Sequence, residues 1–163
     1  MKRPAAAIFG MLIATSVLSA FAVSGLAQDD KVILFSKDDP QMNAAIEKAR
    51  GSLAGFWEKF KTPASNEDGF SLKVMISDDA SSEHFWCSAI EGDATKASCA
   101  IANEPQSVRS VTLGQRIDVN PDHISDWMYR LDGKIKGGET IRVMLERMPK
   151  EQADAYRSLL ADQ

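Results

Sequence analysis

Between residues 42 and 60, hydrophobic positions recur every three or four residues, which predicts one long amphipathic helix. Asp38 or Asp39 is suited to cap its N-terminus, because Pro40 then falls in the first turn, where a helix needs no N–H. The hydrophobic stripe consists of Met42, Ala45, Ile46, Ala49, Leu53, Phe56, Trp57 and Phe60.

The pattern changes to alternation in the middle of the chain. Hydrophobic and polar residues alternate from Phe70 to Ile76, which predicts a half-buried strand. Residues 83–90 and 96–102 have the same character, and residues 110–119 supply one or two further strands. Turn-forming residues connect these segments, so antiparallel pairing of neighbours is the simplest arrangement.

Residues 126–130 and 134–136 predict two short paired strands, because Asp132-Gly133 between them is a strong hairpin-turn signal. An alternative prediction has Asn120 capping a helical turn that begins at Pro121 and places Ile124, Trp127 and Met128 on one face.

A final helix is predicted after the double glycine at residues 137–138, with Thr140 as its cap. Pro149 interrupts it, and a second helical piece follows. The sequence therefore predicts an α+β domain with a long N-terminal helix, an antiparallel sheet of about five strands with hairpins, and a C-terminal helix. The residues of the second piece expected to face inward are Ala153, Tyr156, Leu159 and Leu160.

The first 27 residues have the features of a secretory signal peptide. Two basic residues precede an uncharged hydrophobic segment, and Gly25 and Ala27 are the small residues expected before a signal-peptidase site. We expect cleavage after Ala27 and a single mature domain of residues 28–163, periplasmic or secreted, without stable membrane insertion. In the alternative, residues 4–27 remain as an uncleaved inner-membrane anchor, because an uncharged segment of this length can span a bilayer.

The charge of the mature chain excludes one class of partner. Cleavage removes two of the 19 basic residues and none of the 23 acidic ones, which leaves a net charge of −6. A domain with this negative charge lacks the excess of basic residues that binds the phosphates of nucleic acid. No cluster of histidines and cysteines has the spacing of a metal site, so we predict neither a metal nor a cofactor.

Two cysteines, Cys87 and Cys99, remain in a chain expected to be exported, and an even number in an oxidising compartment favours a disulfide. Both lie in predicted strands on either side of the turn-forming residues 91–95. If this hairpin centres on Asp93, the two cysteines face each other within bonding reach. Two buried free thiols are the alternative, and a redox-active pair is disfavoured because the CxxC spacing is absent.

Candidate catalytic residues are few. His84 or Asp126 could serve as a general base with Glu104 as a second carboxylate, provided that these groups reach one substrate. The sequence has no GxSxG nucleophile elbow. His84 lies within a predicted strand, where a structural or surface role is the more common one.

Asp126, Trp127 and Tyr129 form a candidate binding site, because a carboxylate beside aromatic rings can hold a cationic or sugar-like ligand. In the alternative, both rings fill the core and Asp126 accepts backbone N–H bonds at a corner.

A second candidate site lies at residues 136–142, where glycines precede a helix N-terminus, which is a natural place for an anion. Thr140 and Arg142 would contribute to it, and Arg142 could add a bidentate contact. Glu139 argues against this site, because it places a negative charge where the anion would lie.

Six segments stand out in order along the chain: DDPQMNAAIEKAR, FSLKVMI, EHFW, ANEP, ISDWMY and GGETIRVML. Together they resemble the YegJ-like domain, a small bacterial family labelled as a domain of unknown function. The Gly-Gly-x-Thr-x-Arg motif of that family has its counterparts here at Gly137, Gly138, Thr140 and Arg142. The resemblance implies kinship of fold, and it implies no particular reaction, substrate or catalytic residue.

The sequence leaves two hypotheses for function. The first is a noncatalytic binding module of the cell envelope, which holds an unknown small molecule or a segment of an envelope protein at the corner formed by Asp126, Trp127 and Tyr129. The second is an envelope hydrolase-like enzyme with His84 or Asp126 as general base. We favour the binding module, because the sequence contains no metal cluster, nucleophile motif or cofactor loop.

Overall fold

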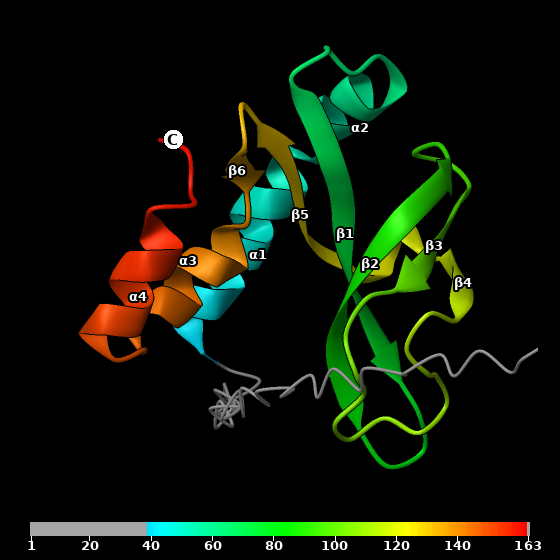
Figure 1. Ribbon diagram of the computed structural model, residues 1–163. Coiled ribbons are helices and arrows are strands. Elements are labelled where there is room, and N and C mark those ends of the chain that lie inside the picture. The colour runs from blue at the N-terminus through cyan, green and yellow to red at the C-terminus, as the bar shows by residue number, and fades with distance from the viewer. Residues whose placement is uncertain (1–38, 163) are drawn as a thin grey trace, which may run out of the picture. The chain divides into compact units, whose positions relative to one another are not determined.

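The computed structural model describes residues 39–162 and confirms an α+β fold (Figure 1). The predicted signal peptide, its cleavage site and the alternative anchor lie outside these residues. The strands form one antiparallel sheet in the order β4-β3-β2-β1-β5-β6, one strand more than the five or so expected. No helix within the described part of the chain is both long and apolar enough to cross a bilayer.

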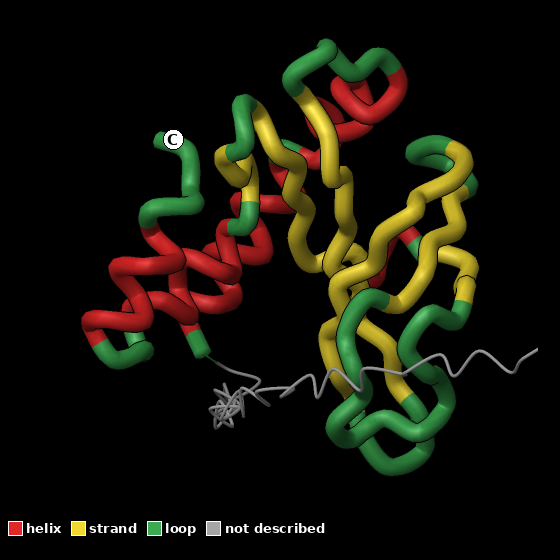
Figure 2. Tube along the Cα trace, in the orientation of Figure 1, coloured by secondary structure: helices red, strands yellow, loops and turns green. Residues whose placement is uncertain are grey.

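The elements follow the order of the predicted segments (Figure 2). The helices are α1 (Pro40–Gly51), α2 (Leu53–Lys61), α3 (Glu139–Glu146) and α4 (Lys150–Arg157), with one 3-10 turn, η1 (Pro121–His123). The strands are β1 (Glu67–Ser77), β2 (Ser82–Gly92), β3 (Ala97–Ile101), β4 (Arg116–Val119), β5 (Ile124–Leu131) and β6 (Lys134–Gly137).

The single long N-terminal helix is not confirmed, because α1 and α2 are separate helices that meet at Ser52. The Ser52 side chain donates to the carbonyls of Lys48 and Ala49, both at 3.1 Å, and its backbone leaves helical geometry at φ −106° and ψ 3°. Such a local bond offers the carbonyls an alternative to the helical ladder. The predicted stripe still faces inward on both helices, since Ala49 and Phe56 are buried.

The pairing register assigns side chains to the two faces of the sheet. Leu72 of β1 lies opposite Cys87 of β2 and Trp127 of β5, so these three residues share one face. α1 and α2 cover this face (Figure 1), and the Phe56 ring lies 5.6 Å from the Trp127 ring. The hydrophobic core lies between the helices and this face. The neighbouring residue Lys73 must therefore face the opposite side.

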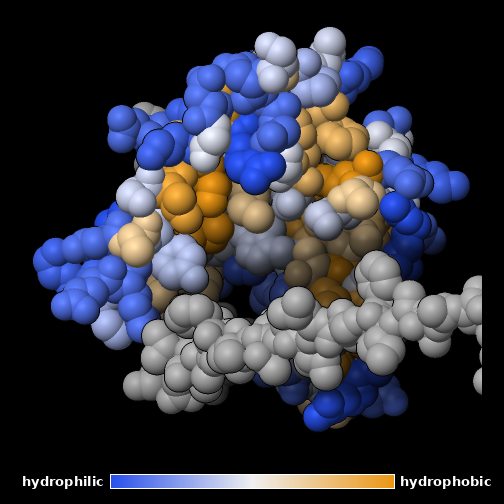
Figure 3. Space-filling model, in the orientation of Figure 1, coloured by the Kyte–Doolittle hydropathy of each residue, from blue (hydrophilic) through white to orange (hydrophobic). Residues whose placement is uncertain are grey.

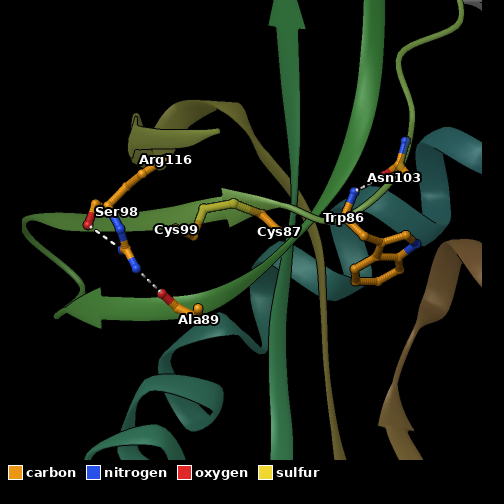
Figure 4. Close-up of a disulfide and its surroundings, with 7 residues drawn as sticks. All are labelled: Trp86, Cys87, Ala89, Ser98, Cys99, Asn103 and Arg116. Atoms are coloured by element: carbon orange, nitrogen blue, oxygen red, sulfur yellow. Dashed lines mark hydrogen bonds between the residues drawn. A yellow bond between two sulfur atoms is a disulfide. The ribbon is translucent and has the colours of Figure 1, made fainter. Parts of the chain in front are cut away.

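A disulfide joins Cys87 of β2 to Cys99 of β3, as predicted, with their Cα atoms 5.6 Å apart (Figure 4). The expected register is wrong, however, because Cys87 lies opposite Ile101 and the two cysteines are diagonal neighbours. A bulge after Ser88 and a four-residue turn that begins at Asp93 shift the hairpin. Closing a loop of this length stabilises the fold by about 3 kcal/mol in the chain-entropy model.

The hairpin of β5 and β6 is confirmed. Asp132 and Gly133 adopt positive φ values of 51° and 76°, which a two-residue turn requires. Asn120 also caps η1 by accepting a bond from the Asp122 N–H at 3.0 Å, so this part of the alternative prediction is correct as well. Trp127 belongs to β5 and not to a helical face.

α3 and α4 are separated at Pro149 as predicted, but the inward face of the second piece is partly wrong. Ala153 is fully buried, whereas 51% of Tyr156 and 48% of Leu159 are exposed. Tyr156 lies on the exposed side of α4, and Leu159 comes after the helix ends at Arg157, where the chain extends along β6.

Candidate functional site

Asp126 of β5 lies at the centre of a polar cluster on the sheet face opposite α1 and α2. Its side chain is 0% exposed and accepts four hydrogen bonds. One comes from the Trp127 N–H at 2.8 Å, and three come from the start of α3: the N–H groups of Glu139 at 3.3 Å and Thr140 at 2.8 Å, and the Thr140 hydroxyl at 2.6 Å. Asp126 therefore caps α3 from a neighbouring strand.

This cap explains the double glycine and corrects the role predicted for Thr140. Gly138 is the N-cap residue of α3, in the left-handed conformation at φ 66°, and it has no side chain that could bond the first N–H groups. Gly137 lies against Trp127, where a Cβ would come within 2.6 Å of a ring carbon. Thr140 follows inside the helix. The anion at this helix N-terminus is thus the protein's own carboxylate.

Lys73 of β1 lies directly opposite Asp126 and extends to the same cluster. Its Nζ donates to the Thr140 hydroxyl at 3.0 Å and lies 5.6 Å from the centre of the Trp86 ring. Burial lowers the pKa of Lys73, and the nearby charge of Asp126 opposes this shift. Burial also raises the pKa of Asp126, against the hydrogen bonds from Thr140 and Trp127 and the charge of Lys73. Each charge therefore favours the ionised form of the other.

His84 of β2 contacts the cluster through Ser125, the extra residue of a bulge in β5. Its Nδ1 lies 2.8 Å from Ser125 Oγ, which itself donates to the Lys73 carbonyl at 3.2 Å. Because that hydroxyl has one proton, the histidine Nδ1–H donates to it. His84 has an exposed surface, but the protein around its ring removes part of its solvation, and this, with a smaller effect of the Lys73 charge, lowers its pKa to about 4 from its ordinary 6.5. His84 is therefore neutral at pH 7.

The aromatic members of the first candidate site pack against the core. Trp127 donates its indole N–H to the Ala49 carbonyl at 2.9 Å, at the end of α1, and its ring stacks on Tyr129 at 6.0 Å. Tyr129 is 9% exposed and also stacks on Phe70 at 5.0 Å. A ligand at this corner would have to displace these contacts and those of Asp126.

The three catalytic candidates do not form one acid–base arrangement in the described structure. His84 and Asp126 lie on the same sheet face, joined through Ser125, but Asp126 is fully buried and Ser125 is 4% exposed. Glu104 is exposed in the loop after β3, and no bond joins it to His84 or Asp126.

Arg142 of α3 lines an open groove of about 570 Å³ between α1, α3 and the C-terminal segment. Its Nη2 donates to the Ala161 carbonyl at 3.0 Å, while its Nε is buried without a hydrogen-bond partner. No ion pair of Arg142 is present within residues 39–162. The apolar part of the groove is formed by Ala44, Ala45, Val143, Leu145 and Leu160.

Sequence reasoning missed Lys73 and Ser125. One signal was available for Lys73, which is the only charge in the alternating segment from Phe70 to Ile76 and therefore marks its polar face. Ser125 gave no such signal, because its contact with His84 depends on a bulge that the sequence does not reveal.

Residues 39–160 match a family described as uncharacterized proteins conserved in bacteria, DUF2314. The chain belongs to this family. It is 33% identical to the uncharacterized protein YegJ of Escherichia coli over 141 residues, which cover 86% of this chain and 91% of that protein.

The chain is also 31% identical over 132 residues to a putative ankyrin repeat protein of Neisseria meningitidis. The match covers 76% of this chain and about half, 52%, of that longer protein. No solved structure matches the chain.

Replacing Asp126 tests its role as the cap of α3. Asp126→Ala leaves several buried donors without an acceptor, so we expect the free energy of unfolding to fall by about 3 kcal/mol in urea denaturation. Asp118→Ala, on the exposed side of β4, is the matched control and should change stability by less than about 0.5 kcal/mol. Equal stability of the two variants would show that α3 does not depend on this carboxylate.

His84 makes the fold sensitive to mild acid. As pH falls from 6.5 toward 4, an unfolded chain protonates this histidine while the folded chain does not, so the free energy of unfolding decreases. His84→Gln should make this decrease smaller, as measured by urea denaturation at each pH. His123→Gln, at the other histidine of the chain, in η1, should retain the wild-type pH slope. The same slope in both variants would contradict the assignment.

Proposed function

We propose that the mature chain is a noncatalytic binding module of the bacterial cell envelope, and that it holds a small monocarboxylate in the groove beside Arg142. The observation that carries this proposal is the Arg142 guanidinium, which lines a groove of ligand size and has no carboxylate partner in the described part of the chain. A guanidinium without a counter-ion in a partly enclosed site attracts an anion through charge-assisted hydrogen bonds.

The other charges of the groove limit the charge of its ligand. Lys48 and Glu139 form an ion pair at 3.0 Å, and the Gln41 amide donates to Glu146 at 3.3 Å. With Arg142 and Arg157, the lining therefore carries three positive and two negative side chains. Arg157 pairs with Asp154 at 2.9 Å, which leaves Arg142 as the lining cation without an ion pair in the described part of the chain. A multiply charged phosphate would meet both carboxylates, whereas a monoanion can pair with Arg142 alone.

The apolar lining of the groove favours a hydrocarbon chain on the ligand, next to its carboxylate. Ala44, Val143 and Leu160 offer methyl groups beside the guanidinium, and transfer of each methylene from water to such a surface is favourable by about 0.8 kcal/mol. A carboxylic acid with a short hydrocarbon chain combines the two requirements. This binding mode uses Arg142 from the predicted site residues and leaves the buried Asp126 cluster intact.

The place in the envelope rests on residues 1–27 and on the disulfide. The N-terminal sequence has the order of a signal peptide, and a bond between Cys87 and Cys99 persists in an oxidising compartment. The DUF2314 kinship adds a bacterial source and leaves the compartment open.

Hydrolase-like chemistry is the second hypothesis, and one contact favours it. The His84 Nδ1 lies 2.8 Å from the Ser125 hydroxyl, the distance of a base from its nucleophile. That hydroxyl donates to the Lys73 carbonyl, however, and Ser125 is 4% exposed. The hydroxyl proton is therefore directed away from His84, and a substrate has little access to the oxygen. For these two reasons we place the binding module first.

Titration with hexanoate tests the groove. In the mature chain, we expect saturable changes in the amide NMR signals of α1 and α3, and hexanamide, which lacks the charge, should not reproduce them. Arg142→Gln should weaken binding at least about tenfold, because a charge-assisted hydrogen bond is worth about 1.5–3 kcal/mol. Arg109→Gln removes the same charge from the exposed loop after β3 and should bind like the wild type. Absence of saturable changes with hexanoate would reject the proposed ligand.

Expression of the full chain in a bacterial host tests export. We expect the product in the periplasmic fraction, with Gln28 as its first residue and no thiol available for alkylation, because the leader is removed and both cysteines are bonded. Intact mass and N-terminal sequencing after alkylation measure both properties. A product that keeps residues 1–27 in the membrane fraction would support the anchor instead.

A further inference from the structure

The chain's own C-terminal segment occupies the outer edge of β6. After α4 ends at Arg157, the backbone extends and runs parallel to the strand, with a bridge between Ile135 and Leu160. The Ile135 N–H donates to the Leu159 carbonyl at 2.8 Å, and the Ala161 N–H donates to the Ile135 carbonyl at 2.9 Å. Residues 158–162 thus act as a short additional strand at an edge that would otherwise present unpaired backbone groups.

Three basic side chains surround this segment, and all of them bond its backbone. Lys134 donates to the Ser158 carbonyl, Lys136 to the Asp162 carbonyl at 2.6 Å, and Arg142 to the Ala161 carbonyl at 3.0 Å.

None of the three basic residues forms an ion pair within residues 39–162, whereas Lys59 and Arg130, near the start of β1, pair with Glu67 and Asp68. The β6 edge therefore carries positive charge that the described chain does not neutralise.

Three of the five side chains of the segment face solvent, whereas Leu160 and Ala161 are half-buried. Leu159 is 48% exposed, and Ser158 and Asp162 are exposed as well. Figure 3 shows hydrophobic residues gathered over β6 and the start of α3, beside the hydrophilic surface of α4. Because the contacts made by Ile135, Lys134, Lys136 and Arg142 all go to backbone atoms, another extended segment could make the same hydrogen bonds.

We propose that the β6 edge is a docking site for an extended acidic segment of a partner protein, which takes the place of residues 158–162. A neutral partner segment would form the same hydrogen bonds as residues 158–162 and no stronger ones. It would not displace them, because residues 158–162 belong to the same chain and have a high effective concentration. An acidic segment adds carboxylates opposite Lys134 and Lys136, and these bonds to charged acceptors are stronger than bonds to carbonyls. This surface adjoins the carboxylate groove, and Arg142 and Leu160 contribute to both.

The test uses the mature chain and two fluorescent peptides of about ten residues, one alternating glutamate with valine and the other glutamine with valine. In fluorescence anisotropy at low salt, the acidic peptide is expected to bind at least tenfold more tightly, and its affinity should fall as salt rises. Ala161→Pro removes the N–H that donates to the Ile135 carbonyl, so it should loosen the C-terminal segment and raise the affinity for the acidic peptide.

Two double variants of equal charge locate the binding site. Lys134→Gln with Lys136→Gln should abolish the preference for the acidic peptide, whereas Lys61→Gln with Lys96→Gln, at exposed positions outside this edge, should retain it. Equal binding of both peptides, or equal loss in the two double variants, would overturn the proposal, as would an Ala161→Pro variant without increased affinity. Hexanoate binding should persist in the Lys134 and Lys136 variant. The two measurements therefore distinguish a wrong docking proposal at the β6 edge from a wrong proposal for the carboxylate groove.

Discussion

The Asp126 carboxylate accepts four hydrogen bonds, and two of them come from the first backbone N–H groups of α3. A helix N-terminus needs acceptors for these groups, and a glycine cap supplies none. A buried carboxylate in turn needs donors, because an unpaired charge away from water is very costly. Strand β5 and helix α3 therefore satisfy each other's hydrogen-bonding groups. Moving either element would leave a polar group without a partner.

The position of α3 determines the rest of the C-terminal half. Gly137 must lack a side chain for the strand to turn past Trp127, and the indole N–H of Trp127 bonds the end of α1. α1 and α3 are thereby held on either side of the groove that contains Arg142. The segments that resemble the DUF2314 family include all of these residues, from the start of α1 to the end of α3.

The polar face of the sheet shows how charge and hydrogen bonding are balanced in a partly buried site. Lys73 and Asp126 share the Thr140 hydroxyl, and the neutral His84 ring adds no further charge. Burial lowers the pKa of Lys73, which the charge of Asp126 opposes, and raises the pKa of Asp126, which the hydrogen bonds from Thr140 and Trp127 and the charge of Lys73 oppose. Removing Asp126 would leave Lys73 without its neighbouring counter-charge, whereas Asp126 without Lys73 would keep its four hydrogen bonds.

The sequence by itself determined the class of fold, the strands from Phe70 to Lys136, the hairpin at Asp132-Gly133 and the cysteine pair. These features depend on local periodicity and turn chemistry, which are visible along one segment.

Only the tertiary structure decided that Asp126 caps α3, that Ser52 divides the N-terminal helix, and that Leu159 leaves the helical phase to run along β6. Each of these depends on a partner distant in sequence or on a local bond competing with the helix, and periodicity carries no information about either. For the same reason, the sequence could not tell which candidate binding residues face a groove. Arg142 lines a groove, whereas Trp127 and Tyr129 belong to the core.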